Sequence, residues 1–237
     1  MIRVKKLVKR YGLKTVLRGV DFKVARGQWV VLAGANGAGK TTVLRVLASL
    51  SRPNSGQVEI AERSLPGDGA AVRRQLGVLL HQPLLYGDLS AEQNLAFYGR
   101  LYAIGDLERR VGEMLALVGL SKWRGEAVRT FSRGIQQRLA IARAMIHEPQ
   151  LLLLDEPYSG LDQDGCDMLD GLLSSKLAQG CTIVMSSNDL AHCEGRVARV
   201  DVLKDGVIAA SAQPGEMPAG GILTFYRQAL QGGNRGG

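Results

Sequence analysis

The chain has 237 residues, of which 46% are hydrophobic and 22% charged, and this balance excludes a disordered chain or a fibre. No apolar run approaches the roughly 18 to 20 residues of a membrane-spanning helix, and the start lacks a signal-peptide pattern, so we expect a cytoplasmic protein. Three cysteines without metal-ligand spacing fit reduced thiols. The formal net charge of +8 permits nucleic acid, anionic lipid or phosphate ligands and selects none of them.

The first predicted elements are strands. Residues 2–12 and 14–27 alternate apolar and polar side chains between glycines, which predicts antiparallel strands. QWVVLAGA, at residues 28–35, is typical of a short buried strand. GKTTVLRVLASL, at residues 39–50, carries apolar residues at helical spacing until a turn cluster at residues 52–56 stops it. A strand, a glycine loop and a helix therefore follow one another.

The middle of the chain changes to helical patterns. After a strand-like run, LGVLLHQ at residues 76–82, Ser90 and Gln93 form a capping-box signature that opens a helix over residues 91–104. Residues 106–120 carry a second helical pattern, and a third helix starts after Ser132. We expect these helices to form an inserted subdomain over residues 83–148.

After this insertion the chain returns to strands at residues 151–155, 181–187 and 200–210. Continuous apolar strands separated by helices are typical of a mainly parallel sheet covered on both faces. We therefore predict one α/β domain with an antiparallel β subdomain at its N-terminus. Its core comprises residues 1–82 and 149–212, its helical subdomain residues 83–148, and its C-terminal tail residues 213–237, where the final GGNRGG is expected to fray.

The glycine loop between strand and helix fits the Walker A, or P-loop, pattern of Gly, four residues, then Gly-Lys-Thr. Its glycines let the backbone wrap around phosphates, and the helix that begins near Gly39 adds positive potential. Lys40 would reach the β- and γ-phosphates, and Thr41 would supply a hydroxyl to Mg²⁺. The predicted nucleotide-binding residues of this loop are Gly34, Ala35, Asn36, Gly37, Ala38, Gly39, Lys40, Thr41 and Thr42.

A carboxylate pair follows the apolar strand LLLL at residues 151–154. Asp155, at the strand end, is the candidate for the metal side of the site. Glu156, one step beyond, can face the γ-phosphate and act as general base on the attacking water. Together with the glycine loop, this pair predicts nucleotide hydrolysis.

Between these motifs stands FSRGIQQRLAIARAMIHEPQLLLLDEPYSGLD, at residues 131–162, and here the chain resembles the ATP-binding subunits of ABC transporters. Their signature is Leu-Ser-Gly-Gly-Gln, and this chain has Phe131, Ser132, Arg133, Gly134 and Ile135 at those positions. The resemblance covers residues 1–212. It implies the P-loop NTPase fold of ABC ATPases, ATP and Mg²⁺ as cofactors, and a second cassette and a membrane-embedded subunit as partners. A nucleic acid partner is not expected.

The resemblance also implies roles for residues outside the first two motifs. Tyr11 would stack on adenine, and Gln82 would touch Mg²⁺ and sense the membrane subunit. Ser132 and Gly134 open a helix whose N–H groups would face the γ-phosphate bound by the opposite subunit. Asp162 ends the loop 159–162 that crosses to that subunit. ATP-dependent dimerisation on the inner face of the membrane is therefore expected.

One position departs from the family pattern. The family has a histidine that holds the γ-phosphate and the attacking water, and this chain has Asn188 there. An amide can still donate a hydrogen bond, but it is shorter than imidazole and cannot become a cation. His192 lies one helical turn further, about 5 to 6 Å along the helix, and is not expected to replace it directly. We predict slow but real hydrolysis.

A narrower resemblance comes from residues 78–104 joined with residues 131–144 and 151–162, which together look like the ATP-binding subunit of the haem exporters of cytochrome c maturation. They are also similar to the ATPases of ABC-2-type exporters of drugs or polysaccharides. In both, the segment after Gln82, with Leu84, Leu85 and Tyr86, would receive a coupling helix of the membrane subunit. Two other classes stay open: soluble ABC proteins of DNA repair, chromosome structure or translation, and a regulatory subunit that binds ATP without hydrolysis.

Overall fold

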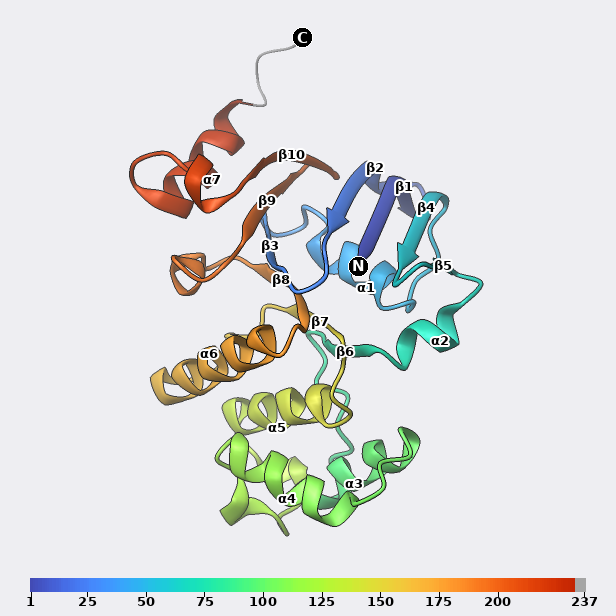
Figure 1. The fold of residues 1–237 in the computed structure, drawn as a ribbon, viewed down its shortest axis with the longest axis vertical. Helices are drawn as coiled ribbons and strands as arrows, with labels where there is room; N and C mark the ends of the chain where they lie inside the picture. Colours follow the sequence, from blue (N-terminus) through green and yellow to red (C-terminus); the bar gives the residue numbers. More distant parts are fainter. Residues whose placement is uncertain (233–237) are drawn as a thin grey trace.

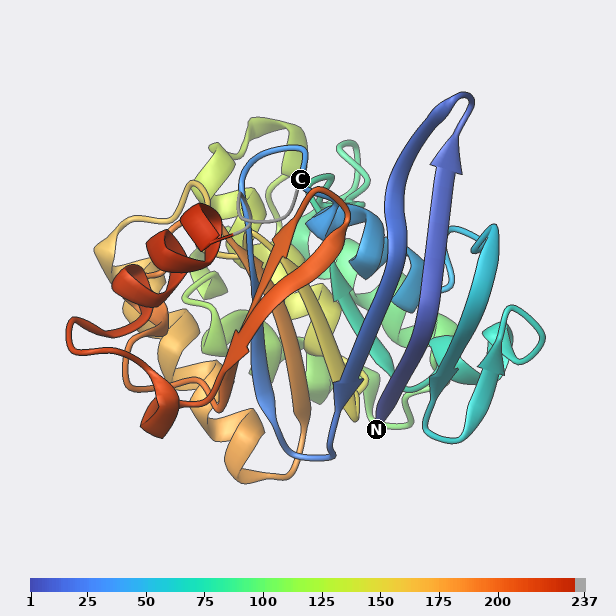
Figure 2. The same ribbon diagram turned by 90° about the horizontal axis from the view of Figure 1, so that it is seen from above.

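The computed structural model describes residues 1–232, and residues 233–237 of the predicted frayed end lie outside that range. Its first sheet is antiparallel, with strand order β2-β1-β4-β5, as predicted for the N-terminus. Figure 2 shows β1 and β2 as a long hairpin beside the second sheet. The strands of the first sheet are β1 (Ile2–Tyr11), β2 (Lys14–Val24), β4 (Ser55–Ile60) and β5 (Arg63–Leu65).

The second sheet is the core of the domain. Its strand order is β10-β9-β3-β8-β7-β6, all parallel except β10 at the edge, which confirms the prediction of a mainly parallel α/β fold. Its strands are β3 (Trp29–Ala33), β6 (Leu76–Leu79), β7 (Leu151–Asp155), β8 (Thr182–Ser187), β9 (Arg199–Lys204) and β10 (Val207–Ala212). Because β3, β7 and β8 are parallel neighbours, their carboxyl ends meet at one edge of the sheet, where α/β proteins bind ligands.

Helices cover both faces of this sheet. Figure 1 shows α3, α4 and α5 at one end of the molecule and α7 at the other. The helix α1, which is buried through Val43, Leu44 and Leu47, packs with strands of both sheets in one apolar cluster. The helices are α1 (Lys40–Leu47), α2 (Gly69–Arg73), α3 (Ala91–Leu101), α4 (Leu107–Leu117), α5 (Arg133–Met145), α6 (Gln163–Ala178) and α7 (Gly221–Gly232), with short 3₁₀ turns η1 (Ser121–Trp123), η2 (Val128–Thr130), η3 (Ala191–Cys193) and η4 (Pro214–Glu216).

The inserted helices begin where their capping residues predict. Ser90 accepts a hydrogen bond from Gln93 N in a complete capping box, and Ser132 accepts one from Ile135 N at 3.4 Å. Helix α3 is shorter than predicted, because the chain reaches the left-handed region at Ala103 with a φ of 54°. The boundaries of the helical subdomain at residues 83 and 148 stay a prediction.

The C-terminal tail, predicted only as a tail, contains a helix that is attached to the core. Ile222 of α7 is buried, and its backbone N–H donates to Glu194 Oε2 at 3.1 Å. Lys204 Nζ donates to Leu230 O at 2.5 Å, which ties β9 to the last turn of α7. Within residues 1–232, none of the helices combines the length and the apolarity needed to cross a membrane.

His147, just after α5, gives the fold a predictable pH dependence. Its ring stacks on Tyr102 at 3.6 Å between centroids and contacts Leu76 O through Nε2 at 3.0 Å. Burial lowers the pKa of His147 from 6.5 to about 4. The folded state therefore takes up this proton later than the unfolded chain, so stability present above pH 6.5 is lost as the pH falls toward 4.

We expect the His147→Phe variant, which keeps a stacking ring, to lose less stability than the wild type between pH 7 and pH 4.5. The difference should reach about 2.5 kcal/mol, because each pKa unit corresponds to about 1.4 kcal/mol and the loss is not yet complete at pH 4.5. Urea denaturation at both pH values measures the free energy of unfolding. Equal losses in the two proteins would show that His147 is not the titrating group.

Candidate nucleotide-binding site

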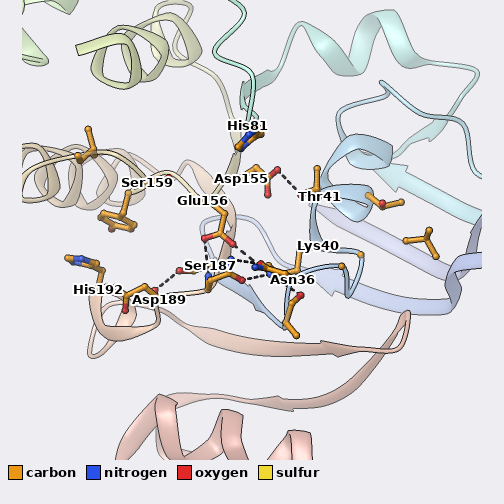
Figure 3. A pocket seen from close by; sticks show the side chains of 18 of the residues that line it. Asn36, Lys40, Thr41, His81, Asp155, Glu156, Ser159, Ser187, Asp189 and His192 are labelled. Atoms are coloured by element: carbon orange, nitrogen blue, oxygen red, sulfur yellow. Dashed lines mark hydrogen bonds and ion pairs between the residues drawn. The ribbon is translucent and has the colours of Figure 1, made fainter. Parts of the chain in front are cut away.

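A cavity of about 1000 Å³ opens at the carboxyl ends of β3, β7 and β8. Its walls come from the β1–β2 turn, the glycine loop, the loop after β7 and the loop after β8. Figure 3 shows Lys40 and Glu156 close together in it, with their side chains pointing toward one another. Of the predicted site residues, it brings together Tyr11, Ala35, Asn36, Gly37, Gly39, Lys40, Thr41, Thr42, Asp155, Glu156 and Asn188.

The glycine loop has a shape that side chains would prevent. A Cβ at Gly34 would lie 2.5 Å from Leu203 O, and one at Gly39 would lie 2.8 Å from Leu17 Cδ2. Gly39 also has a φ of 111°, which an L side chain rarely adopts. As N-cap of α1 it makes no side-chain cap hydrogen bond, so the first N–H groups of the helix can bind phosphate oxygens.

Lys40 is a buried cation at the start of α1. Its Nζ donates to Gly34 O at 2.6 Å and to Asn188 Oδ1 at 2.5 Å, and lies 3.7 Å from Glu156 Oε1. Burial lowers the pKa of Lys40 more than the nearby carboxylates of Glu156 and Asp155 raise it. A phosphate group would replace neutral acceptors by charged oxygens and so stabilise the ammonium group.

Asp155 is held by two hydroxyl groups. Thr41 Oγ1 donates to its Oδ2 at 2.8 Å, and Ser186 Oγ donates to its Oδ1 at 2.6 Å. The hydroxyl and the carboxylate are the oxygen donors that Mg²⁺ prefers. Over residues 1–232, no group of three His, Cys, Asp or Glu side chains could hold a metal, so an Mg²⁺ here would depend on phosphate oxygens for further ligands. The donor set therefore fits a nucleotide-bound Mg²⁺.

Glu156 lines the cavity, and its two carboxylate oxygens have different contacts. Its backbone N–H donates to Ser186 Oγ at 3.0 Å, and its Oε2 accepts from Asn188 N at 2.9 Å. Its Oε1 is buried and has no hydrogen-bond partner in the described part of the chain. The carboxylate side chain is 29% exposed and lines the cavity, so it can accept a proton from a water molecule there. The φ of Glu156 is 49°, so the surroundings must hold this strained backbone in place.

Asn188 joins three parts of the site. Its Oδ1 accepts from Lys40, and its Nδ2 donates to Asn36 Oδ1 at 2.8 Å. Its contact with Glu156 is made by the backbone N–H. Because that contact is made by the backbone, the side-chain amide of Asn188 contacts only Lys40 and Asn36 in this site.

Six predicted residues lie elsewhere. Gly34 and Ala38 belong to the glycine loop but do not line the cavity, and Gln82 is exposed outside it, while its neighbour His81 lines the wall. The role of Gln82 as a metal ligand stays a prediction. Ser132 and Gly134 lie with Asp162 along a separate cavity of about 620 Å³.

The signature residues also have contacts within this chain. A Cβ at Gly134 would lie 2.8 Å from Gly160 O, so the glycine permits close packing against the loop after β7. Asp162 accepts from Gly165 N at 2.9 Å as the N-cap of α6 and from Arg138 Nη2 at 2.5 Å. Arg133 Nη2 donates to Ser159 Oγ at 3.2 Å.

Some residues of the site were not predicted from the sequence. Ser186 pairs with Asp155 in the register of β7 and β8, and the serine pair that ends β8 was the available signal. Tyr158 and His192 line the cavity beyond Glu156. Only the spacing of Tyr158, two residues after Glu156, could have pointed to it.

The comparison with known families agrees with this geometry. A sequence model described as ABC transporter matches residues 17–159, more than half of the chain. The chain belongs to the ABC transporter family, as one of its ATP-binding domains. This membership implies ATP hydrolysis as the activity of the fold.

Individual relatives agree with this assignment. The chain is 35% identical to the daunorubicin resistance ATP-binding protein DrrA3 of Streptomyces coeruleorubidus, over 89% of this chain and 67% of that protein. It is 33% identical to the Nod factor export ATP-binding protein I of Ralstonia nicotianae, over 92% and 68%. The bacitracin transport ATP-binding protein BcrA of Bacillus licheniformis is 35% identical, over 87% and 67%.

Solved structures share the fold. A dimeric structure of the ATP-binding cassette MJ0796 in a post-hydrolysis state bound to ADP and Pi superposes with a TM-score of 0.83 at 26% identity, covering 90% of this chain and 98% of that chain. A structure described as the ATP-binding subunit of an ABC transporter gives 0.84 at 29% identity, covering 100% and 95%. These likenesses confirm the predicted ABC ATPase fold.

Proposed function

We propose that the chain is the ATP-binding and ATP-hydrolysing subunit of a membrane exporter of the ABC-2 type. The observation that carries the proposal is the orientation of Glu156, whose orphan Oε1 lies 3.7 Å from Lys40 Nζ in a cavity that also holds Asp155. A cation for phosphate, a carboxylate for metal and a general base for water are what ATP hydrolysis requires.

In this proposal each group of the cavity has one task. The glycine loop and Lys40 bind the phosphates, and Tyr11, half-exposed at the edge of the cavity, stacks on adenine. Thr41 and Asp155 would hold an Mg²⁺, which would supply positive charge to the phosphates of the nucleotide. The Glu156 carboxylate takes the proton of the attacking water, and Lys40 then stabilises the charge of the departing phosphate.

Asn188 sets the rate in this proposal. Its backbone N–H keeps Glu156 in place, but its side chain ends closer to its own backbone than imidazole would. Loss of a transition-state donor costs about 10² to 10³ in rate when nothing replaces it, and a partial replacement by the amide costs less. We therefore infer slow hydrolysis rather than a regulatory subunit that only binds ATP.

The complete site includes a second cassette. Ser132, Gly134 and Asp162 lie outside the cavity that holds Lys40. In this proposal they contact the nucleotide that is bound by the second cassette. Ser132 caps α5 through the N–H of Ile135, and the N–H groups at the start of this helix that Ser132 does not bind can bind a γ-phosphate. The similar cassette MJ0796 is dimeric in its solved structure, which supports the same assembly here.

The exporter class is supported by the relatives. They are named for daunorubicin resistance, Nod factor export and bacitracin transport, which favours an ABC-2-type exporter and gives no support to haem export. The membrane subunit would hold the chain on the inner face of the membrane. The cassette has no sustained heptad run, so its sequence does not predict the long coiled coil that ABC proteins of DNA repair and chromosome structure carry within theirs.

Leu84 and Tyr86 form the surface that we propose for a coupling helix. Their side chains are 46% and 49% exposed. The backbone beneath them is fixed, because Asn94 binds both Tyr86 N, at 2.8 Å, and Tyr86 O, at 3.0 Å, and Tyr98 donates to Leu84 O at 2.5 Å. Exposed apolar side chains on a rigid backbone suit the apolar face of a partner helix.

Co-purification from detergent-extracted native membranes tests the exporter role. We expect an integral membrane subunit with several spans to remain bound to the tagged chain. The Leu84→Glu variant should lose that subunit, whereas Leu117→Glu, at an equally exposed leucine of α4, should keep it. Recovery of DNA or ribosomes in place of a membrane subunit would contradict the exporter role and favour the soluble class.

A further inference from the structure

The loop after β7, which carries Glu156, contacts the loop after β8, which carries Asn188, at two places. The first is the hydrogen bond between Glu156 and Asn188 N, and the second is a contact between two rings. The ring of Tyr158 stacks on the ring of His192, with centroids 4.5 Å apart and planes 10° apart. Tyr158 OH donates to Asp170 Oδ1 at 2.6 Å. The tyrosine therefore links the loop after β7 both to the loop after β8 and to α6.

Asp170 is the centre of this network. It is 8% exposed on α6, and its second oxygen accepts from Arg196 Nη1, a short contact. The same Arg196 atom also lies 3.2 Å from His192 O. A buried carboxylate costs free energy unless both oxygens are paired, so the network holds Tyr158, Asp170 and Arg196 in one arrangement.

The hydroxyl of Tyr158 stays a donor in this network. Burial, followed by the hydrogen bond and the charge of Asp170, raises the pKa of Tyr158 far above its usual value. The tyrosine is therefore neutral at every physiological pH, and its hydroxyl keeps donating to the Asp170 carboxylate.

The network acts on the loop that carries Glu156. Tyr158 follows Glu156 by two residues, and His192 follows Asn188 by four. In the view of Figure 3, His192 lies on the side of Glu156 away from Lys40. Glu156 has a strained φ of 49°, and its carboxylate contacts the facing loop through one hydrogen bond, at 2.9 Å, to Asn188 N. A second connection between the two loops limits how far they can separate.

We propose that Tyr158 is a positioning residue for hydrolysis: its stack on His192 and its bond to Asp170, itself held by Arg196, keep Glu156 at its contact with Asn188. This inference rests on the proposed ATPase function. The ring stack and the hydrogen bond of Tyr158 are made with His192 and Asp170, outside the glycine loop, so we expect its role to be in hydrolysis and not in phosphate binding. A purely packing role is the alternative that the experiment must exclude.

The Tyr158→Phe variant tests this role, because it keeps the ring stack and removes only the hydroxyl. We expect kcat to fall about tenfold. This loss is smaller than the roughly 10²-fold loss that a 1 Å displacement of a reacting group can cause, because Glu156 keeps its contact with Asn188 N. KM for ATP should change less than about twofold, because uniform binding is untouched. The His192→Phe variant, which retains a stacking ring, should keep most of the rate, and His192→Ala should lose it.

Tyr102→Phe is the matched control, since Tyr102 also stacks on a histidine, far from the cavity. It should leave kcat unchanged. In single-turnover assays, Tyr158→Phe should add no further loss in a Glu156→Gln background, because it acts through Glu156. An unchanged kcat in Tyr158→Phe, or the same fold-loss in both backgrounds, overturns the proposal. If wild type and Glu156→Gln hydrolyse ATP equally, the proposed function fails instead.

Discussion

Replacement of Glu156 by glutamine is expected to stop turnover and leave ATP bound, so that the protein accumulates as an ATP-bound dimer. Glutamine keeps an oxygen for the N–H of Asn188, but it cannot accept the proton of water at physiological pH. Loss of a positioned general base costs typically about 10² to 10⁴ in rate. Binding should persist, because the glycine loop, Lys40 and Asp155 are unchanged.

Light scattering after size-exclusion chromatography measures the assembly of this variant. We expect Glu156→Gln to elute as a dimer with Mg-ATP and as a monomer with ADP, since only ATP supplies the γ-phosphate that the capped N-terminus of α5 can bind. The nucleotide released by denaturation should be ATP, at one molecule per chain. A Glu156→Gln protein that stays monomeric with bound ATP would contradict the composite site.

Replacement of Lys40 by alanine is expected to remove tight ATP binding. Lys40 is 6% exposed and is the cation aimed into the cavity from the glycine loop. A hydrogen bond to a charged group contributes about 1.5 to 3 kcal/mol, which corresponds to roughly 10- to 100-fold in Kd. Because Lys40→Ala also removes the positive charge opposite the phosphates, we expect the increase in Kd to be roughly 100-fold.

Isothermal titration with Mg-ATP measures this loss. Lys14, an exposed lysine at the edge of the same cavity, provides the control. Lys14→Ala should change Kd less than about threefold, because an exposed charge is screened by solvent. If Lys40→Ala bound Mg-ATP as tightly as the wild type, Lys40 would not be the phosphate-binding lysine.

Much of the fold could be predicted from local patterns. The central strands β3, β7 and β8 of the core sheet are buried on both faces, so their apolar runs are continuous. The cap residues Ser90 and Ser132 mark real helix starts. Helix α6 was less visible because Gly165, Gly171 and paired serines interrupt its apolar pattern. Helix α7 begins at Gly221 without an N-cap signature and depends on contacts with η3 and β9.

The site was predictable where its residues end neighbouring parallel strands. The glycine loop follows β3, Asp155 and Glu156 end or follow β7, and Asn188 follows β8, so the topology alone brings them together. Contacts that depend on register or side-chain packing were not predictable. Ser186 reaches Asp155 because β7 and β8 pair at that step, and the Tyr158 network requires α6 to lie beside η3.

One steady-state measurement tests the central claim that Asn188 leaves a working ATPase. Phosphate release at saturating Mg-ATP should be slow but clearly faster in the wild type than in Glu156→Gln. Asn188→His should be faster than the wild type by up to about 10², because imidazole restores the transition-state donor. A wild type no faster than Glu156→Gln, with Asn188→His raising neither rate, would contradict catalysis by this site.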